Sequence, residues 1–188
     1  MFLMLSINIL FIHGTEKIIK FFQLPNGKKI IKGEWKMEHM NDQMIVEFNS
    51  VSKNESFARV VVAAFVARLD PTLEEISDIK TAVSEAVTNS VIHGYDNGDG
   101  KIKIETCIVD DTVTIIVTDY GVGIDNIERA MEPMYTSKPE LERSGMGFAF
   151  MEAFMDELFV DSKPGEGTII TMRKVIGKNS ERWENNVE

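Results

Sequence analysis

The 188-residue sequence has little cysteine and little positive charge. Its one cysteine, Cys107, excludes an intramolecular disulfide and a zinc site built from several cysteines, and it favours a reducing, cytoplasmic compartment. Lys and Arg together number 20 against 30 Asp and Glu, which gives a net charge of −10. Non-specific binding to nucleic acid needs a basic surface, so this composition argues against a protein that acts on DNA or RNA directly.

Long apolar runs, internal repeats and low-complexity segments are also missing. The apolar stretch 1–12 is too short to cross a bilayer as a helix. It also lacks the preceding Lys or Arg and the following small-residue cleavage site of a signal peptide. We therefore expect no membrane role. The content of 44% apolar and 27% charged residues is typical of a soluble globular protein, and the length suits about one domain.

Charge divides the chain into two unequal parts. Residues 1–36 carry six Lys and two Glu, a net charge of +4, whereas residues 37–188 carry 14 basic and 28 acidic side chains, a net charge of −14. The codons for 32–34 can form a purine-rich ribosome-binding sequence, and Met37 or Met40 follows at a suitable distance for initiation. We expect 1–36 to be a non-native leader from a mis-assigned start codon, with a disordered or strand-adding extension as the alternative.

The rest of the chain is predicted to form one α+β domain, residues 40–176, followed by a polar tail, 177–188. Periodicity and turn residues predict a strand, two helices, a hairpin, a mobile lid, a helix and a second hairpin. This order predicts a two-layer α/β sandwich in which helices cover a mixed, mostly antiparallel sheet. The elements expected are strands at 44–48, 101–109, 112–118, 157–161 and 168–174, helices at 52–69, 72–92, 125–130 and 148–156, and a lid at 132–147.

Both long helices begin with a capping-box pattern, Ser52 with Glu55 and Thr72 with Glu75. The first helix is apolar on almost every side, which predicts burial on two sides, one of them against a second subunit or a partner. Arg59 is a charge near its start. We expect it either to contact a partner or to pair with Glu55 four residues earlier.

The second helix carries a carboxylate and a carboxamide on one face. Glu85 and Asn89 are four residues apart, and His93 continues the same face. This combination suits a hydrated Mg²⁺ ion and a base that orients a nucleophile. A solvated helix face has the same pattern.

Three glycine-containing segments follow. Asp119 ends a strand and can accept a hydrogen bond from an exocyclic amine, while Gly121 and Gly123 let the backbone turn and approach a flat ligand. The segment 144–147 opens a helix with small residues and directs N–H groups at an anion. Thr168, after Gly167, can donate to a base edge or to a bridging water. A turn, a hinge and a hairpin are the simpler explanations of each segment.

The order and spacing of these four segments resemble the GHKL ATPase superfamily, over roughly residues 44–175. The resemblance implies the two-layer ATP-binding (Bergerat) fold of that superfamily. Three stretches, 54–59, 84–89 and 136–147, resemble the anti-sigma F family of serine kinases in endospore-forming bacteria.

This resemblance implies a homodimer that binds sigma F with ATP or ADP and blocks its access to RNA polymerase. It also implies a kinase that phosphorylates and inactivates an anti-anti-sigma factor on serine, and so controls sporulation transcription without binding DNA. Two alternatives stay open: a nucleotide-gated anti-sigma module without phosphate transfer, and a stress-response anti-sigma kinase of the same family.

By position, the resemblance makes Glu85 the catalytic carboxylate that orients or deprotonates the attacking serine hydroxyl. Asn89 would coordinate Mg²⁺, and Asp119 would bind the adenine amine. Supporting positions at the adenine are Gly121, Gly123 and Thr168.

The resemblance also assigns the phosphates to the start of the last helix. Their ligands would be backbone N–H groups in the segment Ser144, Gly145, Met146 and Gly147. In the lid, Lys138 would neutralise charge on the γ-phosphate, and Arg143 would do the same or contact a partner.

Overall fold

The computed structural model describes residues 7–10, 19–23, 29–32, 42–132, 134–135 and 145–177. The chain divides into two compact units, Met1–His39 and Met40–Glu188. The first unit contains a three-stranded antiparallel sheet in the order β1-β2-β3. Its strands are β1 (Ile7–Leu10), β2 (Ile19–Gln23) and β3 (Lys29–Lys32). A start at Met37 or Met40 remains a prediction.

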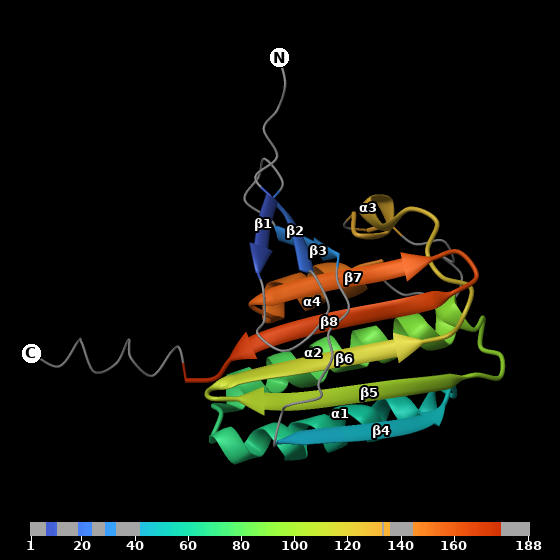
Figure 1. The fold of residues 1–188 in the computed structure, drawn as a ribbon. Helices are drawn as coiled ribbons and strands as arrows, with labels where there is room; N and C mark the ends of the chain where they lie inside the picture. Colours follow the sequence, from blue (N-terminus) through green and yellow to red (C-terminus); the bar gives the residue numbers. More distant parts are fainter. Residues whose placement is uncertain are drawn as a thin grey trace, which may run out of the picture. The chain divides into compact units, whose positions relative to one another are not determined.

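The second unit contains a five-stranded sheet in the order β4-β5-β6-β8-β7, with helices on one face (Figure 1). Its strands are β4 (Gln43–Asn49), β5 (Lys101–Val109), β6 (Thr112–Asp119), β7 (Glu157–Lys163) and β8 (Gly167–Val175). This arrangement confirms the predicted α+β sandwich. Each neighbouring pair of these five strands is antiparallel, so the expected mixed sheet is wholly antiparallel over the described residues.

The helical layer is formed by segments between β4 and β5 and between β6 and β7. These segments are α1 (Lys53–Val66), the 3₁₀ turn η1 (Ala67–Leu69), α2 (Leu73–Asn89), the π-helix η2 (Ser90–Gly94), α3 (Ile127–Ala130) and α4 (Gly147–Phe154). Among these helices none is both long and apolar enough to cross a membrane.

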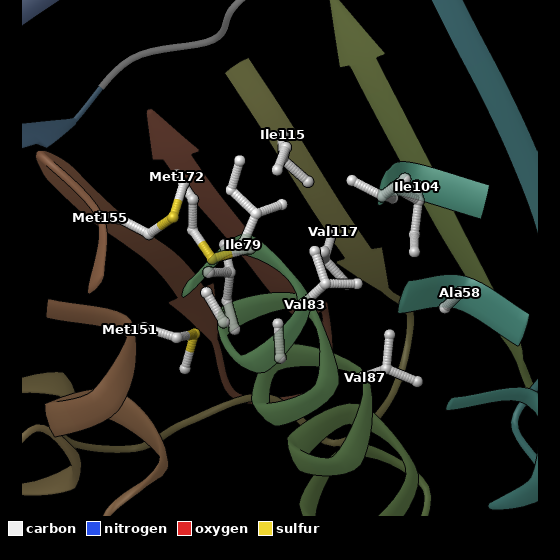
Figure 2. Close-up of a cluster of buried hydrophobic side chains, with 14 of the residues drawn as sticks. Ala58, Ile79, Val83, Val87, Ile104, Ile115, Val117, Met151, Met155 and Met172 are labelled. Atoms are coloured by element: carbon white, nitrogen blue, oxygen red, sulfur yellow. The ribbon is translucent and has the colours of Figure 1, made fainter. Parts of the chain in front are cut away.

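The core lies between α2 and the central strand β6 (Figure 2). Alternate residues of β6 face the helices, and Val117 pairs with Ile104 of β5 and Ile170 of β8. The α2 side chains Ile79 and Val83 are fully buried against this face. Because both layers contribute branched aliphatic side chains, α2 is fixed on the sheet and its C-terminal end is placed near the end of β6.

The second predicted capping box forms, and the first does not. Thr72 Oγ1 accepts from the Glu75 N–H at 3.1 Å, while Glu75 Oε2 accepts from the Thr72 N–H at 2.8 Å. Ser52 instead has helical dihedrals (φ −53°, ψ −33°) and makes no capping bond with its side chain. The Glu55 carboxylate accepts a hydrogen bond from the Ser84 hydroxyl on α2 instead of reaching back to Ser52.

Within this chain, helix α1 is buried on one side. Its core-facing residues Ala58, Val62 and Val66 are fully buried. On the other side Phe57 is 49% exposed and Val60 is 58% exposed. The expected contact of this second side with a subunit or partner stays a prediction.

Helix α2 ends earlier than predicted and continues as the π-helix η2. The N–H of Tyr95 bonds to the carbonyl of Ser90, five residues earlier, at 3.0 Å. A π turn widens the helix by one residue, and such turns often occur at functional sites. Here it places Ser90 and Gly94 beside Asp119.

Candidate functional site

A cavity of about 500 Å³ lies in the second unit, where the ends of α2 and β6 meet the start of α4. Its volume is within the range of pockets that hold small organic ligands. All four sequence motifs contribute to its lining, which includes the predicted residues Asn89, Asp119, Gly123, Gly145, Gly147 and Thr168. The fold therefore brings together segments that are as much as 79 positions apart in the sequence.

Asp119 is the buried acidic group of this cavity. Its Oδ1 accepts from the Gly121 N–H and its Oδ2 accepts from the Ser90 hydroxyl, both at 3.0 Å. Burial raises the pKa of the Asp119 carboxyl above its usual value, and the hydrogen bonds from Gly121 and Ser90 oppose that rise. A carboxylate has about four acceptor positions, so Asp119 retains capacity for a ligand amine.

Close backbone packing explains the glycines around Asp119. A Cβ atom at position 121 would lie 2.1 Å from the Gly94 carbonyl oxygen, and one at position 94 would lie 3.0 Å from Asp119 Oδ1. Gly123 has φ +73°, and its Cβ would lie 2.0 Å from the Lys163 carbonyl oxygen. Gly121 and Gly123 were expected to leave room for a ligand. The structure shows that neighbouring backbone packs closely at both positions, and the room they leave for a ligand stays a prediction.

The loop after β6 is held from both sides. The Val122 N–H donates to the Gly94 carbonyl at 3.0 Å, and the Gly165 N–H donates to the Val122 carbonyl at 2.7 Å. The Ile124 N–H donates to Ser162 Oγ on β7 at 2.9 Å. These bonds fix the cavity wall to both η2 and the β7–β8 hairpin.

Ser162 also determines how Thr168 faces the cavity. The Ser162 hydroxyl donates to the Gly167 carbonyl at 2.7 Å and lies 2.9 Å from Thr168 Oγ1. Because a serine hydroxyl has one hydrogen, the Thr168 hydroxyl is the donor to Ser162. In this network Thr168 offers acceptor positions to a ligand or water, and its predicted donation to a base edge or a bridging water stays a prediction.

Another part of the cavity wall joins α2 to the start of α4. A Cβ atom at Gly147 would lie 3.1 Å from Glu85 Oε2 and 3.2 Å from Asn89 Oδ1, so both side chains lie against this residue. Gly145 has φ +61°, and its carbonyl accepts from the Met134 N–H at 3.0 Å. The first turn of α4, whose N–H groups suit an anion, is thus beside the predicted carboxylate and carboxamide.

Comparison with known proteins places this chain in a family. A family model described as "Histidine kinase-like ATPase domain" matches residues 51–174. An anti-sigma F factor of Clostridium beijerinckii is 64% identical over 135 residues, which cover 71% of this chain and 94% of that protein. The chain belongs to the anti-sigma F factor family. An anti-sigma F factor of Clostridium kluyveri is 60% identical over 140 residues, which cover 74% of this chain and 99% of that protein. One of Caldanaerobacter subterraneus subsp. tengcongensis is 58% identical over 139 residues, which cover 74% of this chain and 97% of that protein.

Some of the residues predicted from the family resemblance lie beside the cavity or outside the described part of the chain. Glu85, Gly121 and Met146 adjoin its lining without belonging to it. The lid residues Lys138 and Arg143, together with Ser144, are outside the described residues.

Arg59 lies apart from the cavity, on α1. Its guanidinium pairs with Glu55 at 3.2 Å and donates to the Ser56 hydroxyl at 3.3 Å. The predicted pairing with Glu55 is therefore present. The Arg59 side chain remains 41% exposed, and its partner contact stays a prediction.

In this member of the anti-sigma F family, three residues near the cavity were missed by sequence reasoning: Ser90, Arg129 and Ser162. Ser90 follows directly after Asn89, but only the π turn directs it to Asp119. Ser162 is far from Asp119 in sequence, and its role depends on the pairing of β7 with β8. No local pattern marks either residue.

Among the described residues of the second unit, Asn89 is the predicted Mg²⁺ ligand that lines the cavity. The described residues contain no group of three or more His, Cys, Asp or Glu placed to hold a metal ion. Mg²⁺ commonly takes most of its ligands from phosphates and water, with only one or two from protein. Asn89 Oδ1, at the α4 end of the cavity, fits such a minimal protein contribution.

Proposed function

We propose that the protein binds ATP or ADP in this cavity, with adenine at Asp119 and the phosphates at the start of α4. The observation that carries the proposal is that Asp119, Asn89 and Gly147 line one cavity and that Gly147 lies against both Glu85 and Asn89. The acceptor capacity of Asp119 suits the adenine amine. The N–H groups at the start of α4 suit phosphate oxygens.

We infer that the site transfers phosphate to a serine of an anti-anti-sigma factor. Glu85 would orient that serine hydroxyl and accept its proton, and Asn89 would hold Mg²⁺ against the phosphates. When bound, ATP supplies the phosphoryl group, and ADP is the product that remains. Phosphoryl transfer depends mainly on positioning and charge neutralisation, which Glu85, Asn89 and the α4 N–H groups can provide.

The names of the relatives support an anti-sigma role. We propose that the protein binds sigma F, keeps it from RNA polymerase and acts as a homodimer in the cytoplasm of sporulating cells. The exposed side of α1, with Phe57 and Val60 beside Arg59, is a suitable surface for a subunit or partner.

Incubation with γ-labelled ATP, Mg²⁺ and an anti-anti-sigma factor tests the kinase. We expect phosphoserine on that factor. Glu85→Ala should bind ATP with a Kd within about twofold of the wild type but lose at least about 100-fold in transfer, because the missing group acts on the hydroxyl. Asn89→Ala should instead weaken binding of Mg²⁺-ATP.

The same reaction distinguishes the alternatives. Retained sigma F binding without any phosphoserine would reject the kinase and leave a nucleotide-gated binding module. Pull-down from sporulating and from stressed cells identifies the sigma factor. Recovery of a different sigma factor, only from stressed cells, would contradict the sporulation role.

A further inference from the structure

Arg129 is the one Lys or Arg among the described residues that line the cavity. Three carboxylates line it as well, those of Asp96, Asp119 and Asp125. A nucleotide brings several more negative charges into this acidic surrounding. Binding therefore requires cations near the phosphates, in addition to the N–H groups at the start of α4.

A chain of contacts places Arg129 near the phosphate end of the cavity. Its guanidinium carbon lies 4.8 Å from the centre of the Tyr135 ring. The preceding residue, Met134, donates its N–H to the Gly145 carbonyl at 3.0 Å. Gly145 is two residues before Gly147, which contacts Glu85 and Asn89, so the Arg129–Tyr135 pair adjoins the start of α4.

This cation–π contact suits a further contact with phosphate. The Tyr135 ring is uncharged, so it holds the guanidinium without neutralising its positive charge, and the five N–H donors of arginine allow a contact with phosphate oxygen as well. We propose that Arg129 binds phosphate oxygens of the nucleotide, and that Tyr135 positions its guanidinium for this contact. The inference rests on the nucleotide site proposed above and adds a residue to it.

Titration calorimetry on the full chain with ATP, ADP and adenosine tests this role. In Arg129→Gln the Kd for ATP and ADP should rise roughly five- to tenfold, as expected for the loss of a charge-assisted hydrogen bond. The Kd for adenosine should be unchanged because adenosine has no phosphate. Tyr135→Leu should weaken ATP binding less than Arg129→Gln does, since it removes the ring that positions the guanidinium but keeps the positive charge of Arg129.

Arg68 provides a matched control. Its guanidinium carbon lies 5.1 Å from the centre of the Phe65 ring, in a similar cation–π contact, but Arg68 is not part of the cavity lining. Arg68→Gln should leave all three Kd values unchanged. The inference is overturned if Arg129→Gln leaves ATP binding unchanged, or weakens adenosine binding as much as ATP binding. Absence of ATP binding by the wild-type protein would instead overturn the nucleotide site itself, and the Arg129 role with it.

Discussion

At the scale of single residues, Asp119 combines a cost in stability with a capacity for binding. Burial raises its pKa, so the folded state binds the proton more readily than the unfolded state. The ionised carboxylate therefore lowers the free energy of unfolding at pH values above the raised pKa, and this penalty disappears as pH falls below the unfolded value. The carboxylate of Asp119 nevertheless lies at a position where its oxygens can accept a hydrogen bond from a ligand.

Asp119→Asn should separate these two effects. The amide retains an oxygen for the Gly121 N–H, and Ser90 can still donate to the Ala86 carbonyl at 3.2 Å. We expect a melting temperature equal to or above that of the wild type. We also expect a Kd for ATP raised by roughly tenfold or more, because an ionised acceptor is lost. A large fall in melting temperature would contradict this assignment.

The pH dependence of binding should follow from the same carboxyl. In the wild type, ATP binding should weaken as pH falls toward the Asp119 pKa, which lies above 3.8. In Asp119→Asn, ATP binding should not weaken in this way as the pH falls, because the variant has no carboxyl at this position. Calorimetry of both proteins across acidic pH, within the range where circular dichroism shows them folded, measures the difference. An identical acid limb in the variant would assign the titration to another group.

Ser162 should act on the loop and on Thr168 together. Ser162→Ala removes the acceptor of the Ile124 N–H and the partner of Thr168, so we expect a loss of about 1–3 kcal/mol in the free energy of unfolding and a weaker ATP Kd. Ser162→Thr keeps the hydroxyl and should restore ATP binding. Equal ATP binding by wild type and the alanine variant would show that the network does not shape the site.

At the scale of elements, sequence patterns predicted helices and hairpins well and their detailed ends less well. The strands of the central hairpin and the Thr72 capping box form as predicted, because their signals are local. Ser52 carries the same local signal but does not cap, because its own backbone is helical and the Glu55 N–H donates to its carbonyl instead of its hydroxyl. The π-helix and the Ser162 network depend on packing between distant segments, which no local pattern encodes.

The two helix starts offer a paired test. Thr72→Ala should lower the free energy of unfolding by about 1 kcal/mol, since it removes a capping hydrogen bond. Ser52→Ala should change it by less than about 0.5 kcal/mol, because no such bond is present. Urea denaturation of both variants measures this. Equal losses of free energy of unfolding in the two variants would contradict the finding that Thr72 caps its helix and Ser52 does not.

At the scale of the whole molecule, the chain consists of a basic first part and an acidic second part that contains the site. The two compact units divide at Met40, close to the point where the charge changes sign. The described residues that line the cavity and form the core around α2 are residues of the second unit. The order of four motifs predicted this site, although each motif alone also suited a turn or a solvated helix face.

A chain that starts at Met40 should therefore keep the fold and the site. We expect its melting temperature to be within a few degrees of the full chain and its Kd for ATP to be within about twofold, because the described cavity lining and core come from the second unit. Thermal unfolding and calorimetry measure both. Loss of folding or of ATP binding on removal of residues 1–39 would show that the first unit is required.

One reaction tests the central claim most directly, that this cavity couples ATP to the control of sigma F. The protein is mixed with γ-labelled ATP, Mg²⁺, sigma F and the anti-anti-sigma factor, and phosphoserine and captured sigma F are measured together. We predict phosphoserine with the wild type, none with Glu85→Ala, and nucleotide-dependent capture of sigma F by both. Phosphoserine formed equally well by Glu85→Ala, or no capture of sigma F by the wild type, would contradict the account.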